Sequence, residues 1–468
     1  MRRASVVQLP PLRHICGQLR AGSLSASALM QACITSYESS ENRLQAYKTW
    51  AGDTALEQAK AADTLLKSGI NLGPLMGIPV SVKDLYAVPG MSTFAGSAQA
   101  LVGWSEPGPV IRAIQSQLGV ITGKTHTVEF AFGGIGINPH WGTPYNPWDA
   151  SQHRIPGGSS SGAGVSLVQG SALLALGTDT AGSVRIPASL TGNTALKTTY
   201  GRWSNEGIVP LSSSLDSPGL LARSIADLAF GFEAIDPLLT SETTPCHALP
   251  SLKGLRIGIP ENFFWKDCDA SIVACVQSAV QRLEAVGAEV VKMAMHGCDT
   301  VYEIFQAGGL GAPELSEFLA SRHPEHISQL DPIVRMRVEA AENMTATEYL
   351  RRVRALKQAS ATAAKIFDEF DVLLTPTVAI SPPAVSTLSD PAAYRHANMM
   401  VLRNTSIANL MTLSAVTMPA GKDDQNMPVG LQLMAGPRQE ARLLAIAGRI
   451  EQELGQAQDI LGTPPNLR

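Results

Sequence analysis

Apolar residues along this chain form helical stripes that are followed at once by short apolar runs. In PVIRAIQSQLGVITGKT, residues 109–125, a stripe with helical spacing contains Val110, Ile111, Ile114 and Leu118. Gly119 follows it, and glycine is the residue that most often ends a helix. The next residues, VITG, are apolar and β-branched, which is typical of a strand. This order predicts a helix that leads into a buried strand.

A second stretch, ASIVACVQSAVQRLEAVGAEVVKM, repeats that order. Its stripe consists of Ile272, Val276, Val280, Leu283 and Val286. Gly287 ends the predicted helix, and AEVVKM predicts a strand.

Three further elements have local signals. LRIGIP, residues 255–260, and FDVLLTP, residues 370–376, are short apolar strands that end in proline. A polar helix is predicted to begin after Thr345, because Thr345 and Glu348 fit a capping box. DPLLTSETTPCHALPS, residues 236–251, is predicted to be an exposed connection. Helices that alternate with strands indicate an α/β fold.

Composition limits the function classes. The chain has 468 residues, of which 45% are hydrophobic and 16% charged, so it can bury a large core. Its formal net charge of −4 gives no general electrostatic reason to bind nucleic acid or an anionic membrane. The 6 cysteines include no C-x-x-C pair, as in proteins of a reducing compartment. Because no apolar run has the length of a signal peptide or a membrane span, we expect a cytoplasmic protein.

Two runs of small and hydroxyl residues lie close together, PGGSSSGAG at 156–164 and GTDTAGSVRIP at 177–187. Turns and helix starts are one interpretation of such runs. GSSSG also matches a nucleophile elbow centred on Ser160, but the residues before it are polar and include prolines, where an elbow needs a buried strand. Neither run contains a phosphate-binding glycine motif. HPEH, residues 323–326, is a weak metal signal, for which a solvated turn is the simpler interpretation.

A further interpretation combines the two runs with Lys83, which lies in the apolar segment PVSVKDLY. With the two runs it resembles the amidase signature family of serine hydrolases, whose pattern is G-G-S-S-G-G and then G-x-D-x-G-G-S-[IV]-R-x-P, with a lysine upstream. Blocks such as GKTHTVEFAFGG, GTPYNPW and PVGLQLMAGP also follow in family order. The resemblance implies an α/β fold with a large twisted mixed β-sheet covered by helices on both faces. It also implies a single domain over residues 1–468, with N-terminal helices to about 65, a signature core at about 66–235 and a C-terminal part from about 250.

The resemblance implies a role for the polar residues of both runs. Ser183 is expected to be the nucleophile, and Ser159, entered by a cis peptide bond, the proton shuttle between Ser183 and Lys83. Backbone N–H groups of an oxyanion hole are expected at Thr180, Ala181, Gly182 and Ser183. The residues expected to hold these loops in shape are Ser160, Asp179 and Arg185.

The chemistry sets a condition on Lys83. A serine hydroxyl needs a base that takes its proton, and no histidine lies in either run. An exposed lysine, with a pKa of about 10.4, stays protonated. Lys83 must therefore be buried among hydroxyl groups. Asp84 follows directly, but on a strand it would point to the opposite face.

The loop AFGGIGINPHWGTPYNPW, residues 131–148, is expected beside the nucleophile. The acyl pocket is expected at Ala131, Phe132, Gly133 and Gly134. The loop contains no Asp, Glu, Lys or Arg, which predicts small neutral aryl or alkyl amides as substrates, with esters or carbamates as side reactions. Only Arg154 and Arg185, which flank the motifs, would give this pocket a charge. No metal or cofactor is expected.

Three points stay open at this stage. The chain resembles the amidase component of a tRNA-dependent amidotransferase, which would need partner subunits. It is also compatible with a non-catalytic binding member of the family, although Lys83, Ser159 and Ser183 are all present. The sequence neither requires nor excludes a homodimer.

Overall fold

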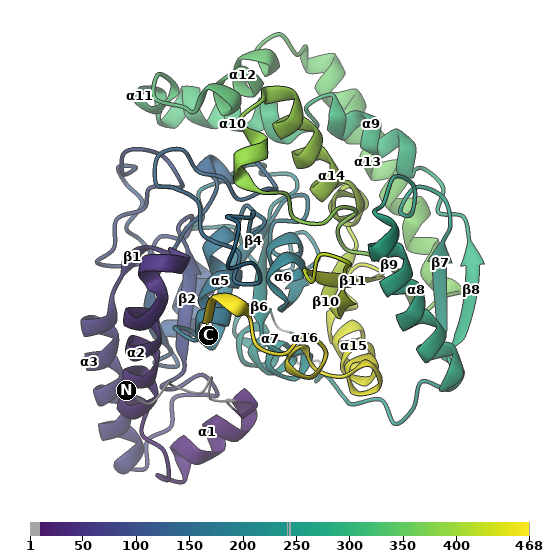
Figure 1. Cartoon of the computed structure of the whole chain (residues 1–468). Helices are drawn as coiled ribbons and strands as arrows, with labels where there is room; N and C mark the ends of the chain where they lie inside the picture. The colour runs from purple at the N-terminus through teal and green to yellow at the C-terminus, as the bar shows by residue number, and fades with distance from the viewer. Residues whose placement is uncertain (1–9, 241, 243–244, 468) are drawn as a thin grey trace.

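One sheet organises the molecule (Figure 1). The computed structural model describes residues 10–240, 242 and 245–467, and within them an 11-stranded mixed sheet has the order β1-β3-β2-β4-β6-β5-β10-β11-β9-β7-β8. Its strands are β1 (Tyr47–Trp50), β2 (Pro79–Lys83), β3 (Val120–Thr125), β4 (Leu174–Asp179), β5 (Thr194–Lys197), β6 (Ser217–Ala222), β7 (Arg256–Pro260), β8 (Glu289–Met293), β9 (Val372–Pro376), β10 (Ser414–Lys422) and β11 (Pro428–Ala435). Strands from the N-terminal and C-terminal parts of the chain share this sheet.

Helices pack against the sheet and extend beyond it. They are α1 (Leu12–Arg20), α2 (Ala26–Leu44), α3 (Gly52–Lys67), α4 (Pro109–Gln115), α5 (Ser161–Gln169), α6 (Arg185–Thr191), α7 (Ile225–Leu239), α8 (Ala270–Ala285), α9 (Cys298–Gln306), α10 (Gly311–Arg322), α11 (Pro324–Ile327), α12 (Pro332–Ala341), α13 (Ala346–Ala364), α14 (Pro391–Leu410), α15 (Glu440–Leu454) and α16 (Ala457–Leu461). Figure 1 shows α10, α11, α12 and α14 gathered at the top of the view.

The central strands are covered on both faces, because successive side chains of a strand point to opposite sides. Ala175 of β4 packs in a cluster with Ala163 of α5 and Ala188 of α6. Leu174 and Leu176, its neighbours on β4, belong instead to the main core. That core also contains Leu228 of α7. The expected α/β fold with a twisted mixed sheet between helices is confirmed.

The elements predicted from local patterns are present. The stripe at 110–118 contains α4, which already ends at Gln115, so Leu118 lies outside the helix; β3 follows. The stripe at 272–286 contains α8, which ends at Ala285, so Val286 is its C-cap; β8 follows. LRIGIP and FDVLLTP contain β7 and β9. Thr345 caps α13 by accepting a hydrogen bond from the Glu348 backbone N–H, as its capping signal predicts.

The connection predicted at residues 236–251 also begins later than predicted. Residues 236–239 belong to α7, so the connection begins at Thr240; Pro237 lies inside the helix, where its ring did not mark an end. Residues 241, 243 and 244 of that connection, and residues 1–9 at the predicted N-terminal part, lie outside the described residues. Among the described residues, no helix combines the length and apolar character that crossing a membrane would require.

The strand register positions the two sequence runs and the lysine. β2 lies between β3 and β4 and is parallel to both. Parallel strands end at the same edge of a sheet, so Lys83, the last residue of β2, lies at the edge where β4 ends with Asp179. The chain then passes through residues 180–184 and enters α6. This edge therefore carries both Lys83 and the loop with Ser183.

Candidate active site

Lys83 is fully buried at the end of β2 and contacts two hydroxyl groups. Its Nζ lies 2.7 Å from Ser159 Oγ and 2.8 Å from Thr178 Oγ1. Burial lowers the pKa of Lys83 to about 7, although the carboxylates of Asp216 and Asp179 act in the opposite direction. A lysine in this state holds a neutral amine in part of its population at neutral pH, as a general base requires.

Ser159 is held by the first glycine run. The peptide bond between Gly158 and Ser159 is cis, as the family resemblance implied. Gly158 N–H donates to the Gly134 carbonyl at 2.7 Å, and Val128 N–H donates to the Ser159 carbonyl at 3.1 Å. A Cβ atom on Gly158 would lie 2.8 Å from the Gly136 nitrogen, so the close approach of these two loops requires glycine.

Ser160 joins the two runs through its backbone. Its N–H donates to the Ser183 carbonyl at 3.1 Å, and its side chain donates weakly to the Thr178 carbonyl at 3.4 Å. In the described part of the chain, no strand lies between β3 and Ser160, which directly precedes α5. A nucleophile elbow at Ser160 therefore lacks the strand it needs. Ser183 is the serine that follows a buried strand, because β4 ends only four residues before it.

The Asp179 carboxylate shapes the loop that carries Ser183. It accepts hydrogen bonds from the backbone N–H groups of Gly182 at 2.7 Å and Val184 at 3.3 Å. Arg185 contacts the same carboxylate with two nitrogens, at 2.9 and 3.0 Å. Burial alone would raise the pKa of Asp179, but Arg185 holds it at about 2, so the carboxylate stays ionised. Asp179 and Arg185 thus lie beside the loop that carries Ser183, as expected from the sequence.

The four expected oxyanion-hole residues are not equivalent. The Gly182 N–H is engaged by Asp179, whereas Thr180, Ala181 and Ser183 line the pocket in front of the loop. Thr180 is fixed from behind, because its hydroxyl donates to Asp216 at 2.5 Å. The sequence predicted four backbone N–H groups for the oxyanion hole. Because the Gly182 N–H donates to Asp179, this prediction is corrected to three candidates, the N–H groups of Thr180, Ala181 and Ser183.

The pocket in front of Ser183 contains three of the four predicted acyl-pocket residues. Ala131, Phe132 and Gly133 line it, whereas the Gly134 N–H donates to the Asn398 side chain at 2.7 Å behind that wall. Phe130 and Ala131 both have positive φ, at 45° and 57°, so the chain turns sharply here. Trp141 and Tyr145 of the same loop pack elsewhere, against His126 and His153.

The sequence matches the Amidase family model over residues 28–444. The chain belongs to the amidase family. The amidase is 55% identical, over 97% of its length and 98% of the relative, to 2-amino-5-chloromuconic acid deaminase of Comamonas testosteroni. It is 35% identical to an amidase of Pseudomonas putida, over 88% of its length and 89% of the relative. It matches a crystal structure of an amidase with a TM-score of 0.86 and 29% identity, covering 95% of its own chain and 100% of the other.

These findings confirm the family predicted from the motifs, and the amidase is accordingly a hydrolase that acts on amide C–N bonds. Of the expected relay, the structure shows Lys83 and Ser159 in direct contact, whereas the described residues show no hydrogen bond between the Ser159 and Ser183 side chains. Within the described residues, the Ser183 hydroxyl makes no hydrogen bond and faces the pocket.

The amidase pocket also contains a charge that the loop did not predict. Arg154 and Arg185, the two arginines considered from sequence, pair with Asp149 and Asp179 and do not line the pocket. Arg337 of α12 lines it instead, so the expectation of a pocket without fixed charge is not met. A helical stripe could have indicated this residue, because Val334, Val338 and Ala341 are the buried face of α12 and Arg337 falls within it.

The HPEH segment is buried, not the solvated turn expected. His323 and His326 are only 5% and 3% exposed. Ligand atoms of His323, Glu325 and His326 lie within 4.8 Å of one another. However, the Trp104 indole N–H donates to His323 Nε2 at 3.0 Å, which leaves the neutral ring protonated at Nδ1, the nitrogen that faces Glu325. A ring in that state offers no free nitrogen to a metal shared with Glu325.

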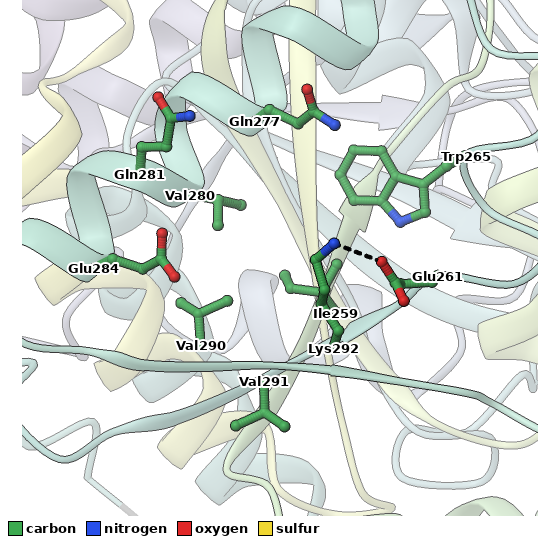
Figure 2. Close-up of a pocket in the computed structure, with 10 residues that line it drawn as sticks. All are labelled: Ile259, Glu261, Trp265, Gln277, Val280, Gln281, Glu284, Val290, Val291 and Lys292. Carbon is green, nitrogen blue, oxygen red and sulfur yellow. Dashed lines mark ion pairs between the residues drawn. The ribbon is translucent and has the colours of Figure 1, made fainter.

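A larger hollow, of about 720 Å³, lies at the other end of the sheet, between α8 and the strands β7 and β8 (Figure 2). Lys292 and Glu261 form an ion pair of 2.8 Å across it. Its other lining residues include Gln277, Gln281 and Val290, and no serine. The residues that line this groove include no counterpart of the buried contact between Lys83 and Ser159.

Proposed function

We propose that the amidase cleaves its substrate through a covalent acyl-enzyme on Ser183, with Ser159 and Lys83 as a proton relay. The observation that carries this proposal is the buried contact of 2.7 Å between Lys83 Nζ and Ser159 Oγ. No carboxylate forms an ion pair with Lys83 among the described residues, so its neutral form is accessible. Catalysis by a serine and a neutral amine meets the general requirements for an activated nucleophile.

The steps balance without a cofactor. Neutral Lys83 accepts the Ser159 proton, Ser159 accepts the Ser183 proton, and Ser183 Oγ attacks the carbonyl carbon. Thr180, Ala181 and Ser183 line the pocket, and their backbone N–H groups are the candidates to stabilise the oxyanion. The relay then delivers the proton to the leaving nitrogen, the C–N bond breaks, and water hydrolyses the ester by the same route.

The relative of 55% identity favours a second candidate reaction at the same site. Its name describes a deaminase that acts on an amino-substituted, unsaturated dicarboxylic acid. For this chain the corresponding reaction is hydrolytic release of ammonia from such an acid, in which the C–N bond breaks and a C–O bond from water replaces it. Both reactions need a hydroxyl activated by Lys83 and Ser159 and a protonated leaving nitrogen.

Two other functions are less well supported. The glutamyl-tRNA(Gln) amidotransferase protein of Chloroflexus aggregans is a more distant relative, at 33% identity. A non-catalytic binding role does not account for a buried lysine held against a serine hydroxyl.

The experiment compares Ser183→Ala with Ser160→Ala in an ammonia-release assay. Ser183→Ala should lower kcat by about 10⁴-fold or more, because the nucleophile is lost. A fluorophosphonate probe should label Ser183 in the wild-type protein and nothing in Ser183→Ala. An active Ser183→Ala variant together with an inactive Ser160→Ala variant would show that Ser160 is the nucleophile.

A further inference from the structure

We propose that Arg337 is the residue that selects the substrate of this pocket, by binding a carboxylate on the substrate's acyl side. The inference rests on the proposed function, because it places that carboxylate in the same pocket as the Ser183 hydroxyl. It predicts that acidic substrates are preferred over neutral ones of the same size.

Arg337 reaches the pocket from a part of the chain far from both serine runs. Its helix, α12, belongs to the group that Figure 1 shows at the top of the view. Arg337 Nη1 donates to the Phe132 carbonyl at 2.7 Å, and the guanidinium carbon lies 3.5 Å from the centre of the Phe132 ring. These two contacts fix the guanidinium against the predicted acyl wall. Ser183 and Ala181 line the same pocket.

Arg337 differs from three arginines of this chain that have acidic partners. Arg185 contacts Asp179 at 2.9 Å, Arg154 contacts Asp149 at 2.7 Å, and Arg202 contacts Asp236 at 2.7 Å. Across residues 10–240, 242 and 245–467, no Asp or Glu forms an ion pair with Arg337. Arg337 is partly buried, and a cation partly withdrawn from water without an anion carries a desolvation cost that a carboxylate of the substrate would relieve.

The guanidinium keeps both its charge and its free donors. Burial lowers the pKa of Arg337 to about 10, which leaves it protonated at neutral pH. Its ionisable neighbours are Tyr394, whose pKa burial raises to about 12, and Arg395, so none of them supplies an anion. Only one of its five N–H groups is used by a described protein atom. The remaining Nε and Nη2 donors can hold a carboxylate in the bidentate geometry that arginine favours.

A purely structural role makes a different prediction. Arg403 also stacks on an aromatic ring, at 4.5 Å from the centre of Phe263, and has no acidic partner in the part of the chain that the structure describes. It donates to the Lys266 carbonyl and does not line the pocket. If Arg337 only supported Phe132 in this way, its loss would affect neutral and acidic substrates alike.

The turnover test uses two amides of equal chain length, adipamate with a terminal carboxylate and hexanamide without one. In the wild-type protein, kcat/KM for adipamate should exceed that for hexanamide by about 100-fold, and Arg337→Met should abolish this ratio. Arg337→Lys should retain part of it, because the charge remains and the bidentate geometry is lost. Arg335→Lys, on the same helix but outside the pocket, is the matched control and should keep the ratio. Equal losses for both amides in Arg337→Met would overturn the proposal.

A binding test separates this inference from the proposed mechanism. Adipate has no C–N bond, so calorimetry can measure its affinity whether or not Ser183 is the nucleophile. We expect adipate to bind wild type and Ser183→Ala alike and to bind Arg337→Met at least about 30-fold more weakly. Thermal unfolding checks that each variant is folded, and Arg337→Lys replaces Arg337→Met if the latter is not. Undiminished adipate binding by these variants would contradict the role of Arg337, whereas full activity of Ser183→Ala would contradict only the mechanism.

Discussion

Two buried lysines on neighbouring strands have different partners, and only one of them is placed to act as the proposed base. Lys83 ends β2 and Lys124 lies in β3, and the two parallel strands pair so that Val82 faces Lys124 and Lys83 faces Thr125. Both lysine side chains are completely buried. Lys124 forms an ion pair with Asp84 at 2.7 Å, whereas Lys83 contacts the hydroxyls of Ser159 and Thr178.

Burial alone does not make a lysine a general base. Desolvation lowers the pKa of both lysines, but the Asp84 carboxylate favours the charged form of Lys124. Asp84 is the next residue after Lys83, yet its side chain points to the other face of the strand and meets Lys124 there. Asp84, the acid nearest to Lys83 in sequence, is therefore paired with Lys124. The hydrogen-bond partners of Lys83 are two neutral hydroxyl groups.

Of the changes to the two lysines, removing Lys83 should have the larger effect on activity. Lys83→Met deletes the proton acceptor and should lower kcat by about 10³- to 10⁴-fold, while the fold is retained because an apolar side chain replaces a buried amine. In the wild type, kcat/KM should rise with pH through about 7, as Lys83 loses its proton, and become constant above it. Steady-state rates between pH 5 and pH 9 measure both quantities. If Lys83→Met kept some activity and its kcat/KM still rose with pH near 7, another group would be the proton acceptor.

Removing Lys124 should damage stability and leave the pH limb in place. Lys124→Met leaves Asp84 buried without its cation, which should lower the free energy of unfolding by about 3–5 kcal/mol. The double variant Lys124→Met with Asp84→Asn removes both charges and should recover much of that loss. Urea unfolding followed by circular dichroism measures the difference. If the single variant were as stable as the wild type but lost the limb near pH 7, the division of roles between the two lysines would be wrong.

The sequence predicted features that depend on residues adjacent in the chain. It did not predict features that depend on contacts between distant segments. The strand that ends in Lys83, the turn at the first glycine run and the opposite direction of Asp84 all follow from adjacent residues. The use of the Gly182 N–H by Asp179 depends on the exact path of a turn. Arg337 depends on a helix that packs over the pocket from more than 150 residues further along the chain, as its hydrogen bond to Phe132 shows. A prediction of the pocket made only from the loop at residues 131–148 could not include Arg337.

A smaller change should tune Lys83 without removing it. Asp216 accepts hydrogen bonds from the Thr180 hydroxyl and from the backbone N–H groups of Leu211 and Ser212. Asn fits the same contacts, because its oxygen can accept from the two N–H groups while its amide donates to the Thr180 hydroxyl. The variant Asp216→Asn therefore removes mainly a negative charge.

The sign of its effect follows from the charges around Lys83. Asp216 and Asp179 both stabilise protonated Lys83, and Asp84 is engaged by Lys124. Burial raises the pKa of Asp216 to about 6, so this carboxylate is charged where Lys83 titrates. Its loss should lower the pKa of Lys83 further and move the acid limb of kcat/KM to lower pH by about half to one unit. A pH profile measured beside the wild type tests this, and Asp84→Asn in the Lys124→Met background should leave the limb where it is. A limb that moves to higher pH in Asp216→Asn would show that Asp216 does not act on Lys83 through its charge.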